Sequence, residues 1–135
     1  MWSAEQIDAL TELVVQRLLV DGVPARRIAP EVAARLSAQT PGLPALCVSM
    51  PIMLAASAIE EMLGAGAQAK DIAQDAWRTA ALIGAEVLAL QSTGSPLPTV
   101  ADLLAAWGDD AFFAARSDGE QAGRRTQPRE GDRPR

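Results

Sequence analysis

Few residues of this sequence belong to the types that enzymes use for chemistry. The chain of 135 residues contains no histidine. This excludes histidine-based catalytic triads, zinc sites with histidine ligands and the Glu-x-x-His pattern of di-iron proteins. Catalysis would have to rest on carboxylates, one lysine or the single thiol, that of Cys47. We therefore expect a protein that is not an enzyme and that has no catalytic, cofactor-binding or metal-binding residues.

Three sulfur-bearing side chains, those of Cys47, Met50 and Met53, are spaced by three residues. Soft ligands on one helical face would suit Cu(I). However, they lie in the most apolar stretch of the chain, where Met and Cys ordinarily fill gaps in a core. An apolar setting also raises the pKa of a thiol and makes it unreactive. We therefore expect all three in the core, with Cys47 buried and inert.

Four acidic residues flank a glycine-containing turn. Glu60 and Glu61 stand near the predicted end of a helix, where the helix dipole disfavours negative charge, and Asp71 and Asp75 follow the turn. The four carboxylates could bind a hard cation, or they could meet an arginine of another helix or another subunit. The interpretation that the sequence favours most is a plain solvated edge.

The turn itself consists of Gly64, Ala65 and Gly66, with Lys70 soon after. A phosphate-binding loop needs the spacing Gly-x-x-x-x-Gly-Lys-Ser/Thr after a strand, which this segment does not have. The two glycines are typical of a helix end. We therefore expect a turn between two helices and no nucleotide site.

The main basic cluster consists of Arg26, Arg27 and Arg35, in a segment that resembles the first half of a DNA-binding helix-turn-helix. A polar recognition helix should follow in that class of protein. Here the breakers between Pro41 and Pro44 and then the most apolar stretch follow instead. The net charge of −5 also repels a phosphate backbone. A solvated basic face is favoured, ahead of a protein-docking patch and of DNA binding.

Composition indicates an all-α fold in one domain. Hydrophobic residues make up 49% of the chain and are mostly Ala, Leu and Val, whereas Tyr is absent and aromatic residues amount to 4%. Ala and Leu favour helices, and strands favour the aromatic types that are scarce here. A single cysteine and an N-terminus without a signal-peptide pattern predict a cytoplasmic protein.

The spacing of apolar residues and the positions of turn residues predict a compact bundle of five or six helices in residues 1–116. The expected helices are 4–20, 30–38, 49–63, 68–90, 99–107 and 109–116, with a single turn at 24–29. Residues 117–135 contain no apolar side chain larger than that of Ala122, so we expect a disordered, arginine-rich tail.

Local signals place the helix ends. Ser3 and Gln6 form a capping box, and Ser49 is the expected cap of the third helix. Thr99 and Asp102 form a similar pair at the fifth helix. Pro30 is expected to divide the second helical stretch, because proline inside a helix loses one hydrogen bond and clashes with the preceding turn.

An internal duplication is an open question. The segment 18–29 resembles the segment 62–73 at an offset of 44 residues, and each ends one helix at a glycine and begins another. Two of the matching positions are alanines in an alanine-rich chain. Convergence on the same type of helical corner is therefore the favoured explanation.

The third helix carries apolar residues around nearly its whole circumference, which predicts a place at the centre of the bundle or in a subunit interface. On the fourth helix, small residues spaced by four leave a smooth strip where another helix could approach. We therefore predict an interface formed by Ile52, Met53, Ala76, Ala80 and Gly84.

These features predict a non-catalytic interaction or assembly protein, either a homo-oligomer or a small accessory subunit that docks on a larger protein partner. The second hypothesis is a helix-turn-helix regulator, and the third is an enzyme that uses carboxylates alone. The apolar stretch 43–59 is too short, and too interrupted by Pro44 and Pro51, to predict a membrane span. No small-molecule substrate is expected.

Overall fold

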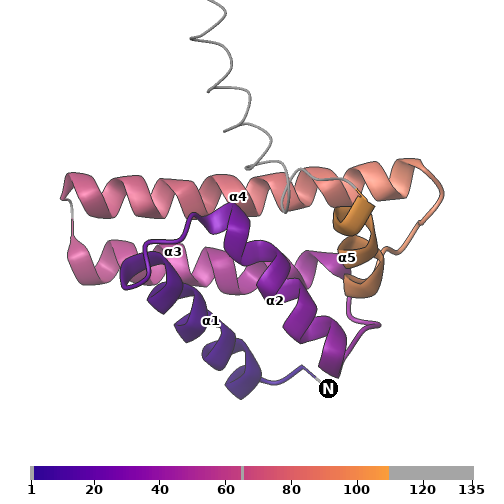
Figure 1. The fold of residues 1–135 in the computed structure, drawn as a ribbon, viewed down its shortest axis with the longest axis horizontal. Helices are drawn as coiled ribbons and strands as arrows, with labels where there is room; N and C mark the ends of the chain where they lie inside the picture. Colours follow the sequence, from indigo (N-terminus) through magenta and orange to yellow (C-terminus); the bar gives the residue numbers. More distant parts are fainter. Residues whose placement is uncertain (1, 65, 110–135) are drawn as a thin grey trace, which may run out of the picture.

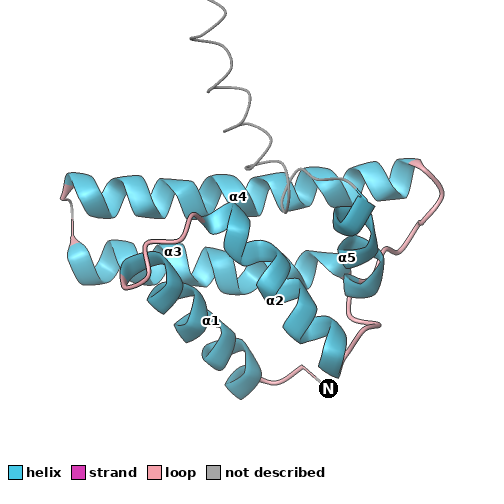
Figure 2. Cartoon of the chain, viewed as in Figure 1, coloured by secondary structure: helices cyan, strands magenta, loops and turns pink. Residues whose placement is uncertain are grey.

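The computed structural model describes residues 2–64 and 66–109, and within these ranges it contains helices and no strand (Figures 1 and 2). The elements are α1 (Ala4–Leu19), α2 (Ala25–Gln39), the 3-10 helix η1 (Ala45–Val48), α3 (Ser49–Leu63), α4 (Ala67–Ser92) and α5 (Val100–Asp109). The predicted all-α fold class is thereby confirmed. The predicted helix at 109–116 and the predicted disordered tail lie outside the described residues, apart from Asp109.

Two helices begin at the caps that the sequence predicts. The Ser3 hydroxyl accepts a hydrogen bond from the backbone N–H of Gln6 at 3.2 Å, and the Ser3 N–H donates to the Gln6 side chain at 2.8 Å. Thr99 and Asp102 exchange the same pair of hydrogen bonds at the start of α5. Each box satisfies two backbone donors that the first turn of a helix leaves unpaired.

The prediction that Pro30 divides the second helical stretch is wrong. α2 is continuous from Ala25 to Gln39, with Pro30 inside it. Proline cannot donate the hydrogen bond to the carbonyl four residues earlier. The helix persists because buried residues precede and follow Pro30 on one face, among them Ile28 and Val32, and all of them pack into the same core.

The prediction that Ser49 caps the third helix is also wrong. η1 continues directly into α3, so Ser49 is a helical residue and the residues before it are helical too. Its hydroxyl donates to the carbonyl of Leu46 at 2.7 Å instead of accepting from the following turn. The turn residues between Pro41 and Pro44 form the loop after α2, and the chain is helical from Ala45 to Leu63.

The long helices α3 and α4 lie antiparallel and side by side, and α1 and α2 cross in front of them in the view of Figure 1. α1 packs mainly on α3, while α2 packs on α4 and α5. Backbone hydrogen bonds from Ala45 to Pro98 and from Val100 to Leu43 join the loop before η1 to the loop before α5. The largest fully buried side chains include Val14, Ile28, Leu36, Ile52, Ile59, Ile83, Leu103 and Trp107.

The two helical corners that suggest a duplication differ in backbone conformation. Gly22, after α1, has a positive φ of 66°. Its counterpart at the offset of 44 residues, Gly66, has a φ of −64° and precedes α4. At the second corner the positive φ belongs to Gly64, with 72°. The two glycines that match at the offset of 44 residues therefore have different backbone conformations in the two corners.

Candidate interaction surface

The structure separates the five predicted interface residues into two groups. Ile52 and Ala76 are fully buried, and Ala80 is only 7% exposed, because all three face the core between the helices. These three side chains are not accessible to a partner in this structure. Met53, 37% exposed, and Gly84, partly exposed, lie at the surface.

The accessible surface of α3 is apolar, and the sequence argument identified only part of it. Eight large apolar side chains of η1, α3 and α4 are exposed. Met62 and Leu63 lie at the end of α3, and we call the other six the apolar face: Leu46, Met50, Met53, Leu54, Trp77 and Leu88. The exposed fractions are 39% for Trp77 and 64% for Leu88. A single exposed side chain of this kind is normal, but a group of them on two neighbouring helices makes this surface a candidate interaction site.

One hydrogen bond sets the register that makes the apolar face continuous. The indole Nε1 of Trp77 donates to Glu60 Oε2 at 3.3 Å, which places these two residues opposite each other on α4 and α3. The two helices are antiparallel. Met53 lies two turns before Glu60 on α3, and Gly84 lies two turns after Trp77 on α4, so Met53 and Gly84 are at the same level. Met53 and Gly84 therefore face the same groove between the helices.

The segments that contain most of the apolar face have almost no charged residues. Residues 36–59 include no Asp, Glu, Lys or Arg, and residues 79–101 include only Glu86. Glu86 lies on the other side of α4 from Leu88, because residues two apart on a helix point in nearly opposite directions. The charged residues near the apolar face are Glu60 and Glu61 of α3 and the exposed Arg78 of α4, and they lie toward the turn between the two helices.

The expectation that Cys47, Met50 and Met53 all lie in the core is wrong. Met50 and Met53 are exposed and Cys47 is half-buried, because the buried face of α3 is formed by other residues, such as Ile52 and Ala56. Partial burial raises the pKa of the Cys47 thiol above its ordinary value. The described residues contain no group of three or more His, Cys, Asp and Glu side chains that could hold a metal ion.

The four carboxylates around the turn do not form one cluster of equivalent groups. Asp75 Oδ2 accepts a hydrogen bond from the backbone N–H of Ala25 at 2.8 Å, so a residue of α4 caps the first turn of α2. Pro24, which precedes α2, provides no side-chain cap. Glu60 accepts from Trp77, while Glu61 and Asp71 are exposed. The glycines between them end α3 and precede α4, as predicted.

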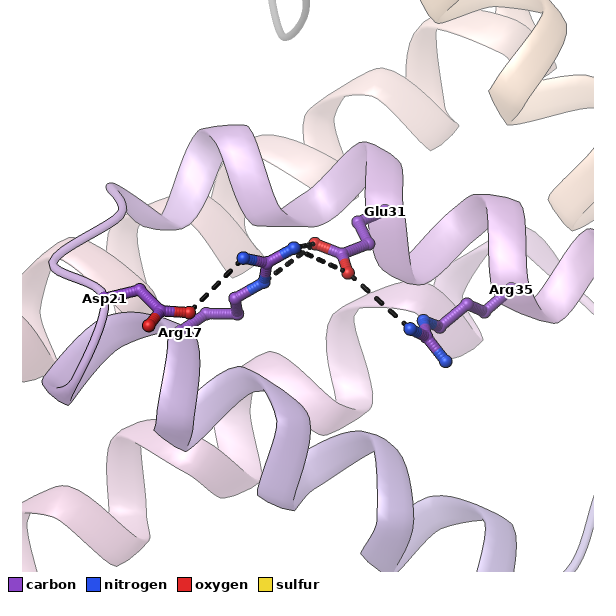
Figure 3. Close-up of polar contacts among 4 residues, drawn as sticks. All are labelled: Arg17, Asp21, Glu31 and Arg35. Carbon is purple, nitrogen blue, oxygen red and sulfur yellow. Dashed lines mark hydrogen bonds and ion pairs between the residues drawn. The ribbon is translucent and has the colours of Figure 1, made fainter.

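One residue of the predicted basic cluster, Arg35, belongs to an ion-pair network centred on Arg17 and Glu31 (Figure 3), while Arg27 is exposed. Arg17 of α1 donates from Nε and from a terminal nitrogen to Glu31 of α2, at 3.1 and 3.0 Å, and it also contacts Asp21 at 3.3 Å. Arg35 approaches Glu31 from the next turn at 3.8 Å. The hydrogen bonds to Glu31 are the main reason that the pKa of Arg17 is raised. This network joins α1 to α2.

Within the described residues, one segment, Ala45–Leu63, is long and apolar enough to cross a membrane by length and composition, with a mean hydropathy of 1.6. η1 and α3 together form this segment, so it is longer than the apolar stretch predicted from the sequence. Core helices of soluble proteins meet the same criterion. The criterion alone therefore does not assign a membrane role.

Comparisons of the chain with protein-family models, with curated proteins and with solved structures gave no match. The function of this chain is therefore inferred from its own geometry.

Proposed function

We propose that this chain is a non-catalytic interaction protein that docks through the apolar face on an apolar, helical protein surface. The observation that carries the proposal is the apolar face itself, which spans two neighbouring helices. Apart from Trp77, its residues lie in segments whose only charged residue is Glu86. The side chains expose on the order of 500 Å² together, which is the size of the largest apolar patches on monomeric proteins, and such patches are often functional. Burial of this surface in a complex would remove it from water.

The two other hypotheses have less support. A helix-turn-helix regulator needs a polar recognition helix after its basic segment, whereas η1 and the apolar α3 follow α2 here. In its basic cluster, Arg35 lies 3.8 Å from Glu31, while Arg27 is exposed.

An enzyme that uses carboxylates needs several of them around one cavity. Near the turn, Asp75 caps a helix and Glu60 accepts a hydrogen bond from an indole. Glu5, Asp8 and Glu12 do line one open hollow between α1 and α3, and this hollow is the place where the enzyme hypothesis would have to be tested. Both hypotheses stay as alternatives to the interaction protein.

A photo-cross-linking phenylalanine derivative, incorporated at Met53 in the cells that make the protein, tests the proposal. We expect a discrete cross-linked species after irradiation, because Met53 lies in the groove of the apolar face. The same derivative in place of Arg27, an exposed residue of α2, is the matched control and should give none. The absence of a species at Met53, or equal yields at both positions, would refute the proposal.

A further inference from the structure

A regular stripe of residues runs along the outer side of α4, and we call it the α4 seam. Its members are exposed, apart from the partly exposed Gly84, and they are spaced alternately by three and four residues: Gln74, Trp77, Ala81, Gly84, Leu88 and Gln91. This alternation keeps side chains on one side of a helix and is the spacing of a coiled-coil contact. None of the six residues is charged.

The α4 seam has the same pattern in both directions. Its midpoint falls between Leu82 and Ile83, and residues at equal distances from the midpoint match in kind. A large apolar residue, Trp77, matches another, Leu88. The small residues Ala81 and Gly84 match each other, and so do the two terminal glutamines. A two-fold axis through the midpoint would therefore bring residues of the same kind from the two copies into contact. An isologous dimer requires a surface that is complementary to itself in this way.

We propose that the occupant of the apolar face is a second copy of this chain, packed antiparallel along the α4 seam. In this dimer Trp77 of one copy meets Leu88 of the other, at both ends of the contact. Ala81 meets Gly84 of the second copy at the centre, and the glutamines close each end with hydrogen bonds. The proposal rests on the proposed function and names its partner.

Gly84 supports a close approach at the centre of the seam. A glycine inside a helix costs about 1 kcal/mol relative to alanine. Apart from its chain neighbours and the backbone of its own helical turns, no atom of the described residues lies within 4 Å of the place where a Cβ would stand, so packing does not require a glycine there. A second helix that crosses at this point would explain the glycine. It allows an axis separation near the short end of the usual range of about 8–10 Å.

Charge favours the antiparallel arrangement. Glu60 lies beside Trp77, Glu61 is its neighbour and the exposed Arg78 follows Trp77, so the charged end of the apolar face is the end toward the turn. In an antiparallel pair this end meets the uncharged Leu88 end of the second copy. In a parallel pair the carboxylates of Glu60 and Glu61 from both copies would lie at the same end, at a cost in electrostatic energy.

The exposed area limits the strength of the dimer. Met50 and Met53 of α3 flank the seam and extend the contact beyond α4. The side chains of the apolar face expose on the order of 500 Å², which is less than the roughly 800 Å² per partner that a standard protein interface buries, so we expect a weak dimer. The net charge of −5 elsewhere on each copy makes this uncharged surface the favourable one for contact between copies.

Sedimentation of the purified full chain over a range of concentrations tests self-association. We expect a dimer that dissociates on dilution. The variant Leu88→Glu should raise the dissociation constant at least about 100-fold, because each copy would bury an unpaired carboxylate against an indole. Leu97→Glu is the matched control, since Leu97 is 85% exposed and lies outside the seam, and it should leave the dimer unchanged. A wild-type chain that stays monomeric would refute the dimer, and so would equal effects of the two variants.

Disulfide trapping tests the antiparallel register. In a Cys47→Ser background, the variants Ala81→Cys and Gly84→Cys are mixed in equal amounts and oxidised mildly. We expect disulfides between position 81 of one copy and position 84 of the other to form fastest. Disulfides that form faster between two copies of the same variant would refute the antiparallel seam.

The two proposals fail in different ways. A monomeric purified protein that still forms a heavier, discrete cross-linked species at Met53 in cells would refute the dimer and retain the docking function. The absence of a cross-linked species at Met53 in cells would refute the docking function itself. A cross-linked species with twice the mass of the chain supports both.

Discussion

At the scale of single residues, long-range polar contacts decide roles that the local sequence does not show. Asp75 is one of four acidic residues around a turn, and the sequence favours solvation for all of them. In the structure its carboxylate caps α2, a helix fifty positions earlier in the chain. The negative charge also lies at the positive end of the α2 dipole, which adds to the stabilisation.

Replacement of Asp75 by alanine should destabilise the protein by about 1 kcal/mol, because the first turn of α2 loses the carboxylate that accepts a hydrogen bond from the Ala25 N–H. Urea unfolding measured by helical circular dichroism would give the change in free energy. The matched control is Asp71→Ala, one helical turn earlier on α4 and exposed, which should change the stability by less than about 0.5 kcal/mol. Equal losses in the two variants would contradict the capping role.

At the scale of elements, tertiary burial overrides the local preference of Pro30. An isolated segment would break at this residue, since the helix lacks one hydrogen bond there. Residues on both sides of Pro30 contribute to one buried face, so breaking the helix would remove one half of α2 from the core. The apolar contacts outweigh the local cost, which is about 3 kcal/mol relative to alanine.

The variant Pro30→Ala should therefore be more stable than the wild type. Alanine restores the backbone donor and removes the clash, while the greater freedom of the unfolded chain offsets about 1 kcal/mol of the gain. We expect a net increase of about 1–2 kcal/mol in chemical unfolding. Pro24→Ala, just before α2, serves as the control and should have a smaller effect, because proline is compatible with a helix start. A loss of stability in Pro30→Ala would show that the proline ring itself packs favourably.

At the scale of the whole molecule, an antiparallel helix pair presents one side to the core and the other to solvent. α3 and α4 bury alanine-rich surfaces against each other, with α1 and α2 on one side. The opposite side carries the apolar face. This division distinguishes neighbouring residues on α4, since Ala80 is buried and Ala81 is exposed.

The adjacent variants Ala80→Glu and Ala81→Glu should have opposite consequences. A carboxylate at position 80 would be buried without a partner and should cost about 3–5 kcal/mol of folding stability. A carboxylate at position 81 would be solvated in a single copy, so the chain should keep its helical signal and sediment as a folded monomer. Circular dichroism and sedimentation of the two purified variants would check this. A folded dimer for Ala81→Glu would contradict the α4 seam.

The sequence by itself determined the helical class, most of the helix ends and the capping pairs at Ser3 and Thr99, because these depend on neighbours within four residues. It also identified an apolar third helix and two surface positions, Met53 and Gly84. Only the tertiary structure decided which side of α3 and α4 is covered. A helix that is apolar around its whole circumference contains no periodic signal for its inner side. On α4 the prediction took Ala76 and Ala80 for an outer strip because they are small and spaced by four, whereas both are buried and the outer stripe lies one position further along the chain, at Trp77 and Ala81. The contact between Asp75 and α2 was equally undetermined, because it joins residues that only the packing of α2 against α4 brings together.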